Sequence, residues 1–221
     1  MPTGRTAGHE LFEDFLHKQG GYDFAFQPDL AAELGAEIDH ACPDYLVRWP
    51  GGVALCEVKH FPRTALDGRP KLGGYVAASD AEVYGPIRNK LRQGARSLWG
   101  LRGLAVPLVI VLTDPAGVVI DLSPYADAGL IVAVVNVDHP AGEVNPAAGD
   151  PTPDRDGLMV RPPGHISAVV VVHSSAAADV FEIGGETAEA LPGGAFEDGR
   201  GERYSYLPDG RYGPRALATA G

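Results

Sequence analysis

The chain has 221 residues, a formal net charge of −11, 45% hydrophobic residues and 21% charged residues. These values are ordinary for a globular protein and exclude a chain that is disordered throughout, and the acidic balance argues against a nonspecific nucleic-acid binder. No apolar run approaches the ~20 residues that cross a membrane, and the stretch MPTGRTAGHELFEDFL lacks the apolar segment of a signal peptide, so we expect a cytoplasmic protein without membrane contact.

The first expected element is a helix over residues 9–18. Its apolar residues recur at helical spacing, and Gly20-Gly21 would end it. These apolar residues are Leu11, Phe12, Phe15 and Leu16. Residues 24–38 are predicted to be irregular, apart from one helical turn over residues 31–34 that Gly35 would end.

Two short segments rich in apolar, aromatic and β-branched residues follow, at positions 45–49 and 53–59. The sequence Pro50-Gly51-Gly52 lies between them and is typical of a turn, so the two segments are predicted to pair as a β-hairpin. Residues 60–79 contain several prolines and glycines and are predicted to form a loop.

A second helix is predicted over residues 86–100, with Pro86 near its first turn and Gly100 near its end. Its core stripe consists of Ile87, Leu91, Ala95 and Leu98. Later runs of strand length are predicted strands, at residues 106–112, 118–122, 130–137 and 166–173, with an edge strand over 203–207.

This order of elements predicts an α/β sandwich with a central mixed β-sheet flanked by helices. We expect a core over residues 1–138 and a Pro/Gly-rich loop or insertion over residues 139–164. Residues 165–221 are expected to form a strand-containing extension that packs on this core.

Charged residues occupy the open end of the predicted hairpin. A four-residue turn would pair Arg48 with Val53. Counting outward then places Asp44 opposite Glu57, and Lys59 joins them on the same face. A three-residue turn without a bulge would instead put the two carboxylates on opposite faces of the hairpin.

Two neighbouring carboxylates repel each other at a cost of a few tenths to about 1 kcal/mol. A divalent cation bound between them makes the arrangement favourable, because it attracts both. Mg²⁺ accepts one or two carboxylates together with waters and substrate phosphate, and a nearby ammonium can orient or help deprotonate an attacking water. The same charges could instead lie on a solvated strand face. Lysine occurs only at positions 18, 59, 71 and 90, and only Lys59 has an acid two residues before it, which favours a functional interpretation.

The pattern Pro43-Asp44 … Glu57-Val58-Lys59 resembles the signature of the PD-(D/E)XK nuclease superfamily, whose members have the restriction-endonuclease-like fold. The resemblance covers roughly the first 140 residues. It implies that Asp44 and Glu57 bind a metal ion and that Lys59 is the catalytic lysine. It also implies that the backbone carbonyl of Val58 faces the metal.

Members of this superfamily often add a glutamate from the first helix to the metal site and to catalysis. Glu10 and Glu13 are both candidates, because residues three apart lie near each other on a helix. We favour Glu10 because its distance from Gly21-Tyr22, where the helix would end, is similar to the spacing in members of the superfamily. Both acids could instead be ordinary residues that balance the helix dipole.

On the helix predicted over residues 86–100, three polar side chains follow one flank of the apolar stripe: Lys90, Gln93 and Ser97. The resemblance implies that Lys90 and Gln93 bind substrate phosphate, although Ser97 stands where some exonuclease-like branches have tyrosine. A second stripe at i, i+4 spacing consists of Arg88, Arg92 and Arg96. This stripe is either a solvated face or a further contact with the substrate.

The resemblance therefore implies a Mg²⁺-dependent nuclease that hydrolyses phosphodiester bonds through a metal-activated water, with Mn²⁺ able to substitute. DNA is favoured over RNA as the substrate, and endonuclease over exonuclease activity. A homodimer is left open by analogy with relatives that cut two strands. The alternatives are a catalytically silent nuclease-like domain that acts as a scaffold or interaction module, and an effector nuclease acting on RNA.

Overall fold

The computed structural model describes residues 4–35, 42–61, 80–113, 164–182, 188–192, 195–196, 203–206 and 212–214, with backbone alone for 80–86, 88, 203–206 and 212–214. In chain order the elements are α1 (Ala7–Gln19), β1 (Asp23–Phe26), α2 (Leu30–Leu34), β2 (Tyr45–Trp49), β3 (Gly52–His60), α3 (Asp80–Leu98), the 3₁₀ turn η1 (Trp99–Leu101), β4 (Leu108–Thr113), β5 (Ala168–Ser174), β6 (Ala177–Glu182), β7 (Arg203–Tyr206) and β8 (Tyr212–Pro214). Within this part of the chain, no helix is long and apolar enough to cross a membrane.

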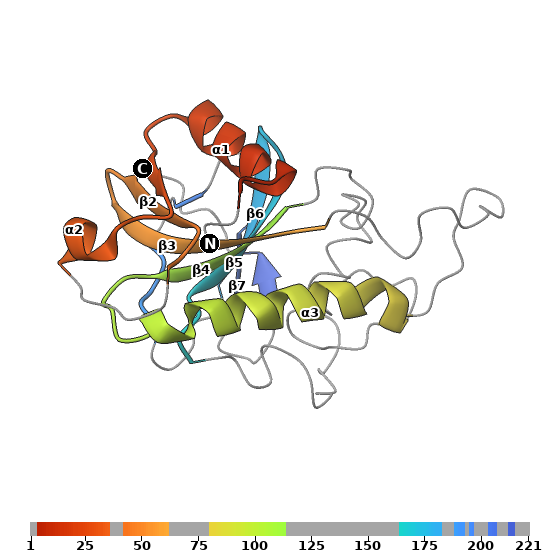
Figure 1. Cartoon of the computed structure of the whole chain (residues 1–221). Coiled ribbons are helices and arrows are strands. Elements are labelled where there is room, and N and C mark those ends of the chain that lie inside the picture. The colour runs from red at the N-terminus through yellow and green to blue at the C-terminus, as the bar shows by residue number, and fades with distance from the viewer. Residues whose placement is uncertain are drawn as a thin grey trace.

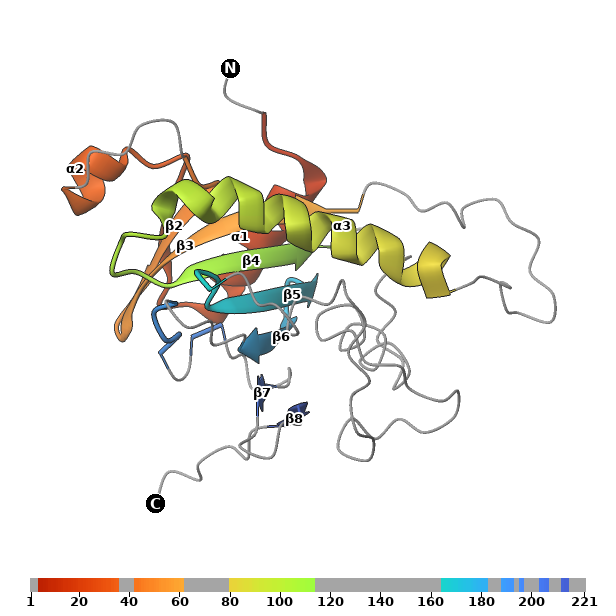
Figure 2. The same cartoon turned by 90° about the horizontal axis from the view of Figure 1, so that it is seen from below.

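Eight strands form one mixed sheet in the order of the chain, from β1 to β8. Strands β1, β2 and β3 pair antiparallel, β3, β4 and β5 pair parallel, and β6 returns antiparallel to β5. Strand β7 adds to β6 in parallel, and β8 adds to β7 antiparallel. Helices α1 and α3 lie on opposite faces of this sheet (Figures 1 and 2), which confirms the predicted α/β architecture with a mixed sheet between helices.

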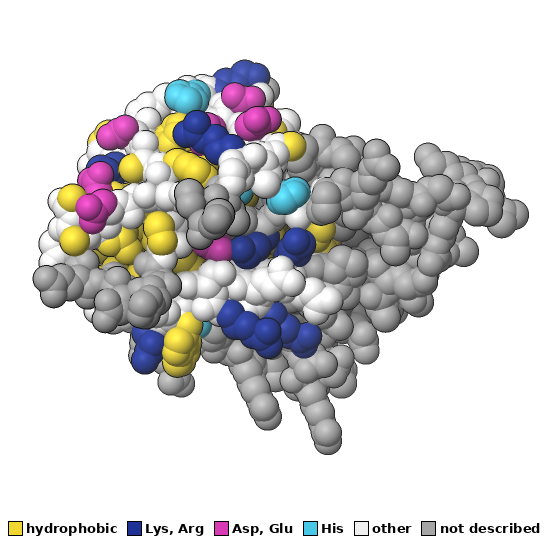
Figure 3. Space-filling view, viewed as in Figure 1, with side chains coloured by type: hydrophobic (Ala, Val, Ile, Leu, Met, Phe, Trp, Pro, Cys, Tyr) yellow, Lys and Arg dark blue, Asp and Glu magenta, His cyan; other side chains and the backbone are white. Residues whose placement is uncertain are grey.

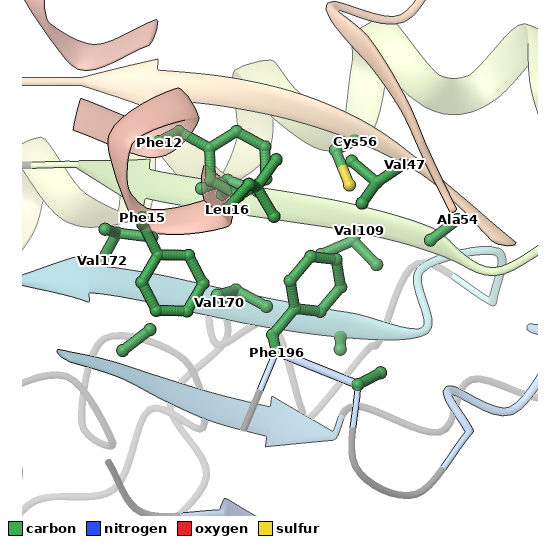
Figure 4. Close-up of a cluster of buried hydrophobic side chains, with 14 of the residues drawn as sticks. Phe12, Phe15, Leu16, Val47, Ala54, Cys56, Val109, Val170, Val172 and Phe196 are labelled. Atoms are coloured by element: carbon green, nitrogen blue, oxygen red, sulfur yellow. The ribbon is translucent and has the colours of Figure 1, made fainter. Parts of the chain in front are cut away.

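The parallel strands β3, β4 and β5 are apolar because both of their faces are covered. Their side chains alternate between two apolar layers, one under each helix. The layer under α3 includes Leu55, Leu91, Ile110 and Val169. The layer under α1 includes Phe12, Phe15, Cys56, Val109 and Val170, and Figure 4 shows the α1 side chains pointing onto the strands.

The β2–β3 hairpin has the register on which the predicted site depends. Arg48 pairs with Val53, which confirms the predicted register, and the ladder ends one pair before Asp44 and Glu57. Continuing the same count places these two carboxylates opposite each other at the open end of the hairpin. The two acids therefore lie where the sheet hydrogen bonding between β2 and β3 stops.

Most predicted elements within the described residues are confirmed. The helices predicted over residues 9–18 and 31–34, and the strands predicted over 106–112, 166–173 and 203–207, match α1, α2, β4, β5 and β7 within two residues at each end. The strands predicted over 118–122 and 130–137, most of the loop over 60–79 and the loop or insertion over 139–164, apart from Gly164, lie outside the described residues.

Two sequence predictions are wrong in detail, and two strands were not predicted. Helix α3 begins at Asp80, so Pro86 lies inside the helix and not near its first turn. A proline removes one backbone donor, and the helix continues on both sides of it. Residues 24–38 are not irregular throughout, because β1 pairs with the edge of β2. Strands β6 and β8 were not predicted, and their places in the sheet come from pairing with β5 and β7.

The first turn of α1 packs directly against the ends of β3 and β4. A Cβ atom at Gly8 would lie 2.3 Å from His60 Cβ and 2.4 Å from Thr113 Oγ1. Real Cβ atoms do not approach other heavy atoms this closely, so only glycine fits here. The contact fixes how near the next residue of the helix, His9, lies to the end of β3.

We expect Gly8→Ala to lower the free energy of unfolding by about 1–3 kcal/mol, because the added methyl group forces α1 away from β3 and β4. The measurement is urea denaturation followed by circular dichroism. Gly4→Ala is the matched control, since a Cβ atom at Gly4 has no heavy atom within 4 Å. Equal denaturation midpoints for the two variants would contradict the close packing at Gly8.

Candidate functional site

The predicted acidic and basic side chains meet at the carboxyl end of β3. Glu57 and Lys59 share the β3 face that packs under α3, since Leu55, two residues earlier, belongs to that apolar layer. Asp44 immediately precedes β2 at the same end of the hairpin. The structure therefore brings together the three side chains of the predicted motif.

Successive residues of β3 point their N–H and C=O groups alternately toward β4 and toward β2. The N–H groups of Leu55 and Phe61 donate to carbonyls at the two ends of β4. Val58 lies at the alternate position, so its N–H and C=O point away from β4 and toward the β2 side of the strand.

Pro43 leaves the carbonyl group of Val58 without a ladder donor. The hairpin register places Pro43 opposite Val58, where an antiparallel ladder would exchange two hydrogen bonds. Proline has no N–H, so Pro43 cannot donate to the Val58 carbonyl oxygen. The Val58 N–H instead donates to Asp44 Oδ2 at 2.9 Å. The Val58 carbonyl, predicted to face a metal, thus points to the same side as Asp44.

Glu57 is a buried acid with two donors beside it. Its side chain is 8% exposed, and Lys59 Nζ donates to Glu57 Oε1 at 2.5 Å. Burial and, next, the charge of Asp44 raise the pKa of Glu57, while Lys59 and a hydrogen bond from Ser97 of α3 partly offset this rise. The net rise in pKa means that the site disfavours the negative charge of Glu57 unless a further cation joins it.

Lys90 of α3 adds a second ammonium close to Lys59. Partial burial and, next, the positive charge of Lys59 lower the pKa of Lys90. In Figure 3, Lys and Arg side chains gather along α3 and in the band between α3 and α1, whereas most acidic side chains on this face lie over α1 and toward α2. An anionic group such as a phosphate would relieve the repulsion between Lys59 and Lys90.

The α1 residue that faces Asp44 is His9, which the sequence analysis did not select. His9 Nδ1 accepts from the backbone N–H of Thr6 at 3.0 Å and lies 2.8 Å from Thr6 Oγ1, as part of a capping box. Its Nε2 lies 3.6 Å from Asp44 Oδ2, too far for a hydrogen bond, and has no hydrogen-bond partner in the described part of the chain although it is buried. In the sequence, the Thr6-x-x-His9 spacing of a helix capping box was the signal that could have pointed to His9.

The two acids predicted from α1 occupy other positions. Glu13 accepts from the Tyr45 hydroxyl at 2.8 Å and from Arg5 Nε at 2.9 Å, so it braces α1 against β2. Glu10 is exposed, and its role as a catalytic and metal-binding residue stays a prediction.

The remaining predicted substrate-binding residues lie along α3. Gln93 is exposed and Arg92 is partly buried, whereas the side chain of Arg88 lies outside the described residues. Within the described ranges, no three His, Cys, Asp or Glu side chains converge closely enough to hold a metal ion by themselves. A metal at this site would need oxygen donors from backbone, water or substrate as well.

A scan against protein-family models, a search of curated proteins and a search of solved structures each returned no match.

Replacing Glu57 by glutamine is expected to raise the free energy of unfolding of the metal-free protein at neutral pH. Because the folded pKa is raised, the native state keeps this proton to higher pH than the unfolded chain, and wild-type stability falls as pH rises from the ordinary value of 4.5 through the folded pKa. Glutamine stays neutral and removes that loss.

Urea denaturation with a chelator, at about pH 4 and about pH 7, measures this effect. The Glu57→Gln variant should gain stability over wild type at the higher pH only, and Glu10→Gln, which alters an exposed acid, should gain none. An equal gain at both pH values would show that ionisation of Glu57 is not the cause.

Proposed function

We propose that this protein is a metal-dependent nuclease of the PD-(D/E)XK type with a restriction-endonuclease-like fold, acting on DNA in preference to RNA. The observation that carries the proposal is the meeting of Asp44, Glu57 and Lys59 at the point where the β2–β3 ladder ends. Few other arrangements explain why a buried acid, a second acid and a lysine share the end of an apolar hairpin.

The donor set suits a hard divalent cation. Asp44 and Glu57 supply carboxylate oxygens, and the Val58 carbonyl oxygen lacks a ladder donor because Pro43 has no N–H. His9 Nδ1 accepts from the Thr6 N–H, so a neutral His9 carries its proton on Nε2, and this buried donor beside Asp44 would orient the carboxylate for the ion instead of binding the ion itself. Mg²⁺, or Mn²⁺ in its place, would neutralise the carboxylates and lower the pKa of a water molecule.

The chain's own cations then act on the substrate. Lys59, held beside Glu57, is placed to orient the attacking water and to donate from Nζ to an oxygen of the scissile phosphate. Partial burial and, next, the charge of Lys59 lower the pKa of Lys90, so Lys90 lies near Lys59 and would bind the same or the adjacent phosphate. Ser97 of α3 lies beside Glu57 and favours the charged form of its carboxyl group.

One observation favours the second candidate, a catalytically silent nuclease-like scaffold. Both motif acids already have partners: Glu57 accepts from Lys59, and Asp44 accepts from the Val58 N–H. A domain with this arrangement could fold without a metal. Calorimetric titration with Mg²⁺ and Mn²⁺ separates the two candidates, because a silent scaffold has no need to bind either ion at this site.

We expect Asp44→Ala and Lys59→Ala each to abolish metal-dependent cleavage while the circular dichroism spectrum stays unchanged. Loss of Asp44 removes a metal ligand, and loss of Lys59 removes the cation that acts on the water and the phosphate. The assay compares plasmid, linear, single-stranded and branched DNA with RNA, in Mg²⁺ and in Mn²⁺. Undiminished cleavage by the purified Asp44→Ala variant would show that Asp44 is not a required metal ligand.

The role of His9 is tested against that of Glu10. His9→Asn keeps a side-chain acceptor for the Thr6 N–H but removes Nε2, so we expect it to weaken Mn²⁺ binding by about 10- to 100-fold. Glu10→Gln, on the exposed side of α1, is expected to leave the affinity unchanged. Isothermal titration calorimetry gives both dissociation constants. If Glu10→Gln were the weaker binder, Glu10 would be the α1 ligand, as the sequence predicts.

A further inference from the structure

An exposed tryptophan stands at the end of α3, away from the site just described. Trp99 is 53% exposed and is the exposed large hydrophobic side chain of the described residues. It opens η1, two residues after Ser97, whose hydroxyl bonds to Glu57. About half of this large apolar side chain is therefore in contact with water.

The indole is held in place although it is exposed. The Arg102 guanidinium lies over the ring at 4.2 Å from its centroid, and Arg102 Nη1 donates to the Trp99 carbonyl oxygen at 2.9 Å. The His165 ring meets Trp99 edge to face at 5.0 Å, and His165 Nε2 lies 2.9 Å from the Ala95 carbonyl oxygen. A ring fixed on these sides loses little conformational entropy when a ligand stacks on it.

The surroundings of Trp99 are positively charged. The sequence has no acid between Glu82 and Asp114, although the chain as a whole carries a net charge of −11. Arg92 and Arg96 precede Trp99 by seven and three positions, so the three residues follow one ridge of the helix. Figure 3 shows Lys and Arg side chains along α3 on the same face as the cations beside the site. This charge is complementary to a phosphate backbone.

We propose that Trp99 and its neighbours Arg96 and Arg102 form a platform that binds an unpaired strand of the nucleic-acid substrate. A base stacks on the Trp99–Arg102 pair, and the arginines contact the flanking phosphates. The proposal rests on the proposed nuclease function, because it concerns the same substrate. Since α3 carries both Ser97 at the site and Trp99 at the platform, a strand crossing α3 reaches both. The platform favours single-stranded ends or flaps over intact duplex.

The test measures binding separately from cleavage. All variants carry Lys59→Ala, so that the DNA stays intact, and bind a labelled single strand of about 12 nucleotides in fluorescence anisotropy. Trp99→Ala should weaken binding by about 5- to 100-fold, whereas Trp99→Phe should retain most of the affinity. Arg96→Gln should make the salt dependence shallower by about 0.7 in the logarithmic slope.

Lys18→Gln is the matched control. It removes one positive charge from α1, on the sheet face opposite α3, and should leave the affinity unchanged. Should Trp99→Ala bind as the Lys59→Ala parent does, or weaken single-stranded and blunt duplex DNA equally, the stacking platform is refuted. A Trp99→Ala variant that dissociates a dimer in sedimentation, with DNA binding intact, would refute it in favour of a contact between two chains.

Failure of the platform is distinguishable from failure of the nuclease proposal. Trp99-dependent binding without any cleavage by the wild type would overturn the nuclease activity and support the platform. Cleavage that depends on Lys59, together with normal DNA binding by Trp99→Ala, would support the nuclease activity and overturn the platform. Thermal denaturation of Trp99→Ala and of Trp99→Leu shows whether a loss of DNA binding or of cleavage comes from unfolding.

Discussion

The hydrogen bond from the Val58 amide to Asp44 is the contact on which the candidate site depends. The Val58 N–H donates to the Asp44 side chain where the β2–β3 ladder ends, and Pro43, which has no N–H, cannot donate to the Val58 carbonyl. At this end of the sheet a side-chain oxygen of Asp44 accepts from the Val58 N–H, and the Val58 carbonyl oxygen has no ladder donor because residue 43 is proline. The apolar strands on either side keep this arrangement rigid.

The electrostatics of the site oppose its stability. Burial and the charge of Asp44 raise the pKa of Glu57, while partial burial and the charge of Lys59 lower the pKa of Lys90. Each pair of like charges is tolerated because an opposite charge or a hydroxyl is close by. Strain of this kind is typical of sites that bind a charged ligand, since a cation relieves the acids and a phosphate relieves the lysines.

Local patterns predicted the parts of the fold that depend on local physics. Turn residues and apolar alternation placed the hairpin in its register, and helical spacing placed α1 and the core stripe of α3. The same reasoning missed β1 and β6, because a strand of four to six residues gains its stability from the partner strand. It also started α3 too late, because Pro86 marks a helix start by local preference but lies within a longer helix here.

The sequence by itself determined that Asp44, Glu57 and Lys59 stand at the open end of one hairpin, and the observed pairing of Arg48 with Val53 decided between the two turn lengths that the sequence left open. Only the tertiary structure decided which residues join them. His9 reaches Asp44 because glycine at position 8 lets α1 approach β3, and Ser97 reaches Glu57 because α3 packs on the same strand. Such contacts join segments far apart in the chain, and they are set by how closely helices pack on a sheet, which no local pattern encodes.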